Sequence, residues 1–189
     1  MRRVEPGRRR PRSLIGISGL ALFACMFLPA MRGCNAPITP LDAPVFLPPY
    51  VYGLVFAVIA VWRSGRGLGV GVHALRVVSA LIVIGSVVAT AFVPPVGMAE
   101  LALGCALLGV IGVAGARERR VAAAGMAVGA ICILWFGFLS LTPDALIGVH
   151  LALCASIGLF AGSVAWLREL VTRPAVDMPR AAAIVRHRR

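Results

Sequence analysis

The sequence contains no lysine and little charge of either sign, and both shortages bear on where the protein resides. Charged residues make up 14% of the 189 residues, only seven residues are acidic, and 60% of the chain is hydrophobic. Soluble domains carry about 25% charged and about 45–50% apolar residues. The chain therefore has too little charge to cover a water-facing surface, and we predict an integral membrane protein.

Several chemistries are excluded by missing motifs. The five cysteines include no CxxC pair, and Cys25, Cys105, Cys132 and Cys154 fall inside apolar runs, where thiols behave as small hydrophobic groups. No His, Cys, Asp or Glu residues have metal-ligand spacing. The glycines of residues 65–71 lack the dinucleotide-loop spacing, and a Walker loop needs lysine, so we interpret them as a flexible linker. We expect no cofactor, no metal and no catalytic residue.

Long apolar runs are the main feature that is present. A helix that crosses a bilayer needs about 20 apolar residues. Six runs approach this length, at residues 13–31, 46–62, 72–93, 97–116, 121–142 and 145–167. They are continuously apolar rather than alternating, which is typical of helices and not of barrel strands. The sequence predicts an all-α, polytopic membrane protein, a bundle of six transmembrane helices arranged as three helical hairpins.

The arginines indicate how these spans are oriented. With the N-terminus inside, every arginine except Arg32 falls in the tails or near the inner ends of the spans. Basic residues collect on the cytoplasmic side of membrane proteins, so we predict that the N-terminus and the C-terminus are both cytoplasmic. The lysine-free composition, rich in alanine, glycine and valine, is typical of a GC-rich bacterial genome. We therefore expect the bacterial inner membrane.

The first apolar run has a second interpretation. A basic segment followed by an apolar stretch is also the pattern of a cleaved signal peptide. We favour a retained span, because residues 13–31 approach the full length that crosses a bilayer.

The basic tails, residues 1–12 and 168–189, carry six arginines each. An arginine near an anionic leaflet contributes about 1 kcal/mol to membrane binding. We expect the tails to bind anionic lipids and not nucleic acid. The alternative is that these arginines only fix the orientation during insertion.

Ionisable residues close to the predicted outer surface form a candidate polar site. Glu100, Asp144 and His150 follow outer turns, and Arg32 lies on the long outer loop. Ionisable groups at membrane depth are candidates for function. The alternative is that each side chain reaches lipid headgroups or pairs with Arg32.

The first outer loop is a candidate partner-binding surface. It holds six of the 13 prolines between residues 29 and 49, and proline favours an extended, semi-rigid backbone. We predict that a partner protein contacts Cys34, Asp42, Tyr50 and Tyr52 there.

Small residues at four-residue spacing predict where helices pack closely. Gly125 and Gly129 lie in the fifth run, and Gly158 and Gly162 lie in the sixth. Such pairs let helix backbones approach each other in lipid. We expect packing within one chain, with a homo-oligomer interface as the alternative.

Three functional hypotheses follow. The first is a non-enzymatic multi-pass protein that acts by helix packing or by binding a partner through the proline-rich loop. The alternative is a small transporter or channel subunit with an outer-facing polar site. A membrane-embedded enzyme comes third, because no groups converge on a reaction centre.

Overall fold

The computed structural model describes residues 10–33, 36–43, 46–61, 65–113 and 117–172. These residues form an all-α structure, as predicted, with six α-helices. The helices are α1 (Arg10–Ala24), α2 (Pro48–Val61), α3 (Gly65–Phe92), α4 (Pro94–Val113), α5 (Arg117–Ser140) and α6 (Ile147–Thr172).

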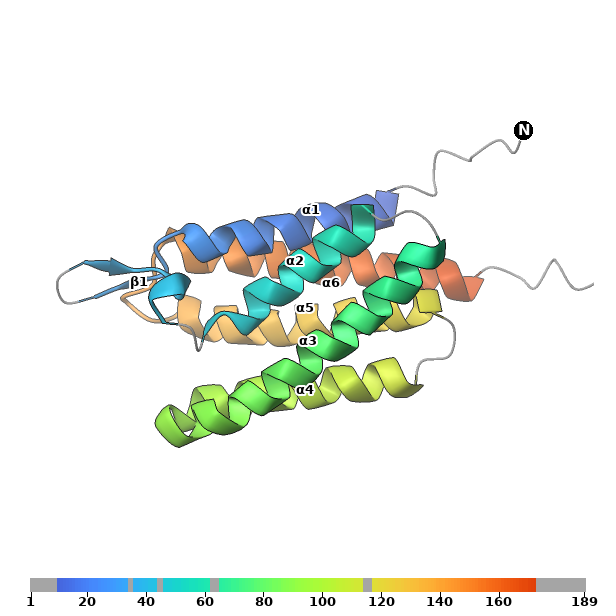
Figure 1. The fold of residues 1–189 in the computed structure, drawn as a ribbon. Helices are drawn as coiled ribbons and strands as arrows, with labels where there is room; N and C mark the ends of the chain where they lie inside the picture. Colours follow the sequence, from blue (N-terminus) through green and yellow to red (C-terminus); the bar gives the residue numbers. More distant parts are fainter. Residues whose placement is uncertain (1–9, 34–35, 44–45, 62–64, 114–116, 173–189) are drawn as a thin grey trace, which may run out of the picture.

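The helices lie side by side, and successive helices run in opposite directions (Figure 1). In the main group, α1 contacts α2 and α6, and α5 packs along α6. The helices α3 and α4 pack mainly on each other and form a hairpin along one side of that group (Figure 1). The bundle therefore has an arginine end, which carries Arg12, Arg119, Arg120 and Arg168, and an opposite cap end.

Four helices, α3 to α6, are long and apolar enough to cross a membrane. The other two predicted runs, 13–31 and 46–62, form shorter helices. The helix α1 gives way to the 3-10 helix η2 (Cys25–Phe27), and α2 starts only at Pro48. Proline lacks a backbone N–H and breaks a helix unless it lies in the first turn, so the prolines around the outer loop shorten both helices.

The interpretation of residues 65–71 as a linker is wrong, because α3 begins at Gly65. Glycine costs a helix about 1 kcal/mol relative to alanine, and packing compensates for this cost. A Cβ atom on Gly71 would lie 2.7 Å from Cγ1 of Ile59 in α2. The absent side chain thus lets the start of α3 lie against α2.

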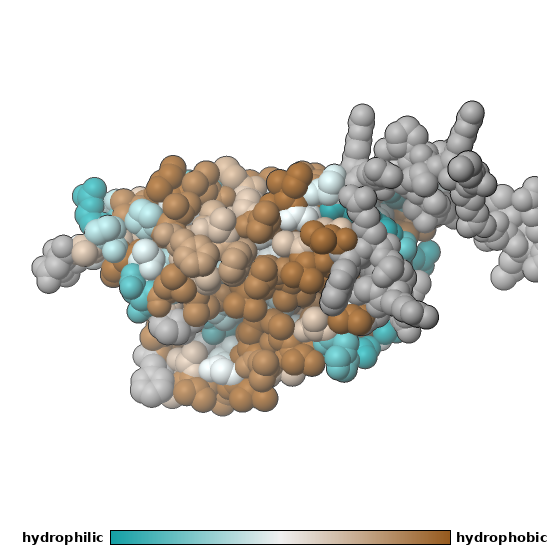
Figure 2. Space-filling model, turned by 45° about the horizontal axis from the view of Figure 1, so that its top comes forward, coloured by the Kyte–Doolittle hydropathy of each residue, from teal (hydrophilic) through white to brown (hydrophobic). Residues whose placement is uncertain are grey.

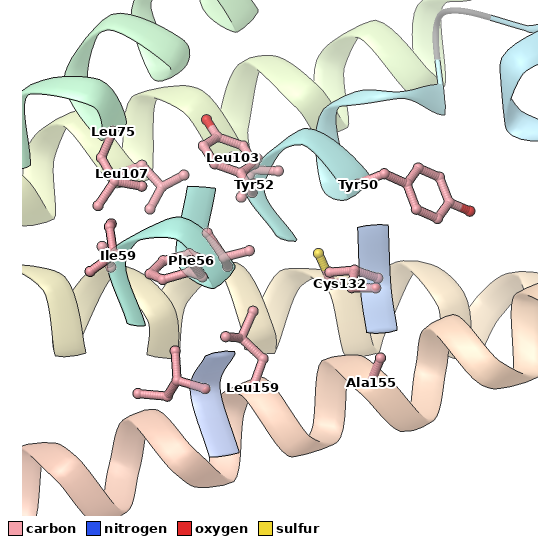
Figure 3. Packing of buried hydrophobic residues seen from close by; sticks show 14 of the residues in the cluster. Tyr50, Tyr52, Phe56, Ile59, Leu75, Leu103, Leu107, Cys132, Ala155 and Leu159 are labelled. Atoms are coloured by element: carbon pink, nitrogen blue, oxygen red, sulfur yellow. The ribbon is translucent and has the colours of Figure 1, made fainter. Parts of the chain in front are cut away.

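The core lies where α2 meets the other helices. Figure 3 shows Tyr52, Phe56 and Ile59 of α2 between residues of α4, such as Leu103, and Leu159 of α6. Tyr52, Phe56 and Leu159 are fully buried. Tight packing of this kind, and not exclusion of water, holds helices together in a lipid environment.

Glycines mark the closest helix contacts. Cβ atoms added to Gly125 and Gly129 of α5 would collide with Ser163 and Phe160 of α6. Cβ atoms on Gly158 and Gly162 of α6 would meet Ser18 and Ile15 of α1. The four predicted packing glycines therefore all lie between helices of the same chain.

Sequence reasoning missed a further pair of packing glycines. A Cβ atom on Gly19 of α1 would lie 2.6 Å from the Gly53 carbonyl oxygen, and one on Gly53 of α2 would lie 2.7 Å from the Gly19 carbonyl oxygen. The two glycines sit on different helices, so no spacing within one helix pairs them.

The outer surface of the bundle is apolar in its middle. Figure 2 shows hydrophobic residues over the centre of the visible face and hydrophilic residues toward its two ends. Large apolar side chains such as Ile84, Leu134 and Phe138 are more than half exposed. A soluble monomer rarely exposes so extensive an apolar surface.

The name cap is given to residues 28–47. The described residues of this segment lie at the end of the main helix group that is opposite the arginine end. In it, β1 (Met31–Arg32) pairs antiparallel with β2 (Pro37–Ile38), and the 3-10 helix η3 (Pro40–Asp42) follows. Backbone hydrogen bonds tie the cap to the turn between α5 and α6. They run from Arg32 N to Asp144 O, from Leu146 N to Ala30 O and from Gly148 N to Pro29 O, at 2.9–3.0 Å.

A capping box stabilises the N-terminus of η3. The Asp42 carboxylate accepts hydrogen bonds from the backbone N–H and the hydroxyl of Thr39, both at 2.8 Å. The backbone donor and then the hydroxyl hold the pKa of Asp42 below its usual range.

At the arginine end, Arg12 links the first helix to the last two. Its guanidinium donates to the Glu118 carboxylate of α5 at 2.9 Å. It also lies 4.8 Å from the ring centre of Trp166 in α6.

Candidate functional site

The candidate site is a cavity between α2 and the α3–α4 hairpin. Its volume is about 530 Å³, and it opens to the outside of the bundle between these helices. Its walls include Pro48 and Val51 of α2, Ile82, Gly85 and Ala89 of α3, and Glu100 of α4. Every lining residue except Glu100 is apolar. A mostly apolar cavity with one precisely placed polar group is typical of small-molecule sites.

The hairpin turn places Glu100 in this cavity. Pro94 and Pro95 start α4 directly after α3 ends, and proline is well suited to the first helical turn. Gly97 lies so close to Thr90 that a Cβ atom would overlap the Thr90 backbone. This tight turn sets Glu100, in the second turn of α4, against Ser86 of α3.

Glu100 is buried, with 8% of its surface exposed. Its Oε2 atom lies 3.4 Å from Oγ of Ser86, which is itself fully buried. Among the described residues, no ion pair joins this carboxyl group to an arginine or a histidine. A buried carboxylate without a cationic partner is costly, so this acid needs either a proton or a cation.

Ser86 has a second, closer partner. Its Oγ atom lies 2.6 Å from the Ile82 carbonyl oxygen one turn earlier in α3. A hydroxyl has one proton to donate, and O–H···O bonds are usually about 2.5–3.0 Å long. The contact of Ser86 with the Ile82 carbonyl is therefore the stronger of the two, and its contact with the Glu100 carboxyl group, at 3.4 Å, is a long one.

A parallel polar contact lies one heptad earlier on α3. The Tyr52 hydroxyl of α2 donates to Oγ of Ser79 at 3.1 Å, and both residues are fully buried. Ser79 and Ser86 are seven residues apart, about two helical turns. They place hydroxyls on the face of α3 that looks toward α2 and α4.

A smaller void borders Glu100 on the side of α5. It measures about 30 Å³ and is lined by Phe46, Pro49, Cys132 and Trp135 among others. Phe46 and Trp135 also line a void of about 40 Å³ beneath the cap. Glu100 thus lies between the open cavity and the smaller void on the side of α5.

The structure divides the predicted outer polar site. Arg32 and Asp144 are neighbours through a backbone hydrogen bond, and both side chains are exposed. His150 is exposed in the first turn of α6, just after the same connection that carries Asp144. Glu100 is instead buried on α4, and in the described residues its hydrogen-bond partner is Ser86. Glu100 therefore differs from the other three residues, whose side chains are exposed.

The predicted partner surface also needs correction. Tyr50 and Tyr52 are 2% and 0% exposed, so they belong to the core and cannot present a surface to a partner. Figure 3 shows both side chains packed inside the bundle. Asp42 is exposed on η3, where it caps Thr39. Cys34 lies outside the described residues.

Ser86 is the site residue that sequence reasoning missed as a partner of Glu100. Serine is common in membrane helices, where its hydroxyl bonds back to the preceding turn. The spacing of Ser79 and Ser86 was the available signal, because polar residues seven apart share one helix face. The sequence does not show which helix this face contacts, because that depends on how α3 packs across α2 and α4.

The described residues contain no group of three or more His, Cys, Asp or Glu side chains that could hold a metal ion. No protein-family model matches the chain, and no curated protein or solved structure matches it at a significant level.

Proposed function

We propose that the protein is a multi-pass membrane protein that binds a small amphipathic cation in the cavity beside Glu100. The observation that carries this proposal is the apolar cavity of about 530 Å³ whose one polar wall is a buried carboxyl group. The proposal corresponds to a small transporter or a binding subunit, and it assigns no catalytic step.

The membrane arrangement is part of the proposal. The helices α3 to α6 cross the bilayer, and α1 and α2 cross it as shorter spans within the same bundle. The apolar middle of the surface faces lipid, and the arginine end faces the cytoplasm, because arginine accumulates on that side. The membrane is the inner membrane of a bacterium, and the basic tails bind its anionic lipids.

Charge and shape both favour a cationic occupant. The carboxyl group has no cation beside it in the described residues, so a cation would supply the charge that burial leaves uncompensated. The remaining walls offer only apolar side chains. The ligand class that satisfies both conditions has one positive charge and a large hydrophobic body.

Tetraphenylphosphonium and tetraphenylborate provide a direct test, because they match in shape and differ in the sign of their charge. We expect the purified protein to bind the cation, measured by equilibrium dialysis in detergent, and to bind the anion much more weakly. Glu100→Gln should weaken cation binding by more than about tenfold, because losing one partner of a buried charge pair costs about 2–5 kcal/mol.

A pair of glycine variants tests the location of binding. A Cβ atom on Gly85, which lines the cavity, or on Gly109 of α4, which does not, meets nothing within 4 Å. Gly85→Leu should fill the cavity and abolish binding, whereas Gly109→Leu should leave binding unchanged. Equal binding of the two probe ions, or equal effects of the two variants, would contradict the proposal.

A second candidate function is the docking of a partner protein on the cap. Its support is that Ile38 and Leu41 are 41% and 45% exposed on the cap, beyond the ends of the helices. Photo-crosslinkers placed at these two residues should form the same adduct in intact cells, and Leu134 in the lipid-facing surface serves as the control position. Adducts that are absent, or that form equally from Leu134, would remove this candidate.

A further inference from the structure

The pair formed by Ser86 and Glu100 contains one hydroxyl proton and two acceptors for it. Oγ of Ser86 lies 2.6 Å from the Ile82 carbonyl oxygen and 3.4 Å from Oε2 of Glu100. The Ser86 hydroxyl can donate to either acceptor, and the contact with Ile82 is the shorter. Because Glu100 is buried and only this long contact reaches it among the described side chains, a proton on the carboxyl group keeps the site neutral when no cation is bound.

We propose that Glu100 is a proton–cation exchange site, at which an incoming cation displaces the proton of the Glu100 carboxyl group, next to Ser86. This inference rests on the proposed function, because it uses the same cavity and the same cation. It adds that binding releases a proton, and it assigns Ser86 a positioning role.

The exchange balances without any further reactant. The carboxylic acid of Glu100 loses its proton, which passes to water at the cap end, where Leu47 and Val93 border the cavity. The carboxylate that forms is neutralised by the bound cation, so the buried site stays electrically neutral in both states. Neutrality matters because an isolated buried charge is strongly unfavourable.

Ser86 can stabilise the ionised state by turning its proton. Rotation about its side-chain bonds moves the hydroxyl proton from the Ile82 carbonyl to the Glu100 carboxylate. The carbonyl loses little, because in an α-helix it already accepts the backbone N–H four residues on, which here belongs to Ser86. Hydrogen bonds to an ionised acceptor are stronger than neutral ones, so the rotation favours the cation-bound state.

The other polar and titratable side chains near Glu100, within the described part of the chain, are uncharged. Tyr52 of α2 is directed toward Glu100, and its hydroxyl is bonded to Ser79. From α5, Cys132 borders the small void beside Glu100. On α3 the neighbouring polar side chains are Ser86 and Thr90, and the Thr90 hydroxyl donates to the Ser86 carbonyl oxygen.

The test measures protons and cations together. The full-length protein is placed in detergent and weakly buffered solution near neutral pH, with a pH-indicator dye, and tetraphenylphosphonium is added. We expect protons to be released as the cation binds, approaching one proton for each bound cation at pH values low enough to keep the free carboxyl group protonated, as linkage requires. The number of bound cations is measured in parallel by dialysis, which gives the number of protons released per bound cation. Glu100→Gln should release no protons.

The two levels of the proposal fail in different ways. Cation binding without proton release would overturn the exchange and leave the proposed function intact. Absence of cation binding would overturn both. Binding that is independent of pH would also contradict the exchange, because a proton competes with the cation only if both occupy the same carboxyl group.

The positioning role of Ser86 is tested by the pH dependence of cation binding in two variants. Ser86→Ala removes the donor to the carboxylate, so half-maximal cation binding should move to higher pH while the protein stays folded. Ser86→Thr keeps the hydroxyl and should restore the wild-type pH profile. An unchanged profile in Ser86→Ala would show that Ser86 does not position the exchange.

Discussion

Single glycines determine how closely the helices approach. A Cβ atom on Gly129 would lie 2.8 Å from both the backbone nitrogen and Cβ of Phe160, so α5 and α6 would have to move apart. Overpacking of this kind costs about 1–3 kcal/mol. We expect Gly129→Ala to destabilise the folded protein by that amount, measured by unfolding in mixed detergent micelles.

Gly137 in the same helix is the matched control, because a Cβ atom there meets nothing within 4 Å. Gly137→Ala should be neutral or should stabilise the helix by up to about 1 kcal/mol, since alanine is the better helix former. If the two substitutions had the same effect, helix propensity and not packing would govern α5.

For single residues, sequence patterns correctly predicted the packing glycines and misplaced two tyrosines. The four-residue spacing of Gly129 and its neighbours reflects helix geometry, which a sequence displays directly. Tyr50 and Tyr52 were expected at a partner-binding surface because they adjoin the proline-rich outer loop. They are buried instead, because the α2 face that carries them meets other helices, and this depends on tertiary packing.

Among the elements, the cap should lose stability in acid. The Thr39 donors lower the pKa of Asp42, so ionised Asp42 stabilises η3 above its usual titration range, and this stabilisation is lost as the pH falls. We expect NMR signals of Thr39 to titrate with Asp42, below the usual aspartate range.

Thr39→Ala removes the hydroxyl donor while the backbone N–H remains, so the pKa of Asp42 should rise only part of the way to its usual range. Asp42→Asn should abolish the titration of the Thr39 signals. A Thr39 signal that moves at the usual aspartate pKa would show that the capping box does not form.

The helices themselves were the most predictable elements. Their number and order follow from apolar runs, which directly reflect what a helix in lipid requires. Their boundaries were less predictable. The helix α3 starts at Gly65 because Gly71 packs on Ile59, and proline shortens α1 and α2 at the cap. Glu100 was identified from its own chemistry, but the cavity that it lines is formed between α2 and the α3–α4 hairpin and depends on how these helices pack.

For the whole molecule, the orientation of the bundle can be tested with two fusions. A reporter that is active only in the cytoplasm should work at the C-terminus and should be silent when inserted at Pro143 between α5 and α6. Pro143 comes before the start of α6 and the C-terminus comes after its end. Because α6 is long enough to cross the membrane, the two reporters should lie on opposite sides of it.

A third fusion at the N-terminus counts the spans. Activity at both termini requires an even number of crossings, as six helices in alternating directions provide. A reporter that works at only one terminus of a well-inserted protein would mean that a helix such as α2 does not cross.

The contact between α1 and α6 has a consequence for how the protein is made. These are the first and last helices of the described residues, yet Gly158 and Gly162 of α6 pack directly on Ser18 and Ile15 of α1. Chains are synthesised from the N-terminus, so α1 is made long before its partner α6. The contact that joins α1 to α6 can therefore form only after α2 to α5 have been synthesised. A chain truncated before α6 would leave this face of α1 open, and a cell's membrane proteases would have a means of recognising unfinished copies.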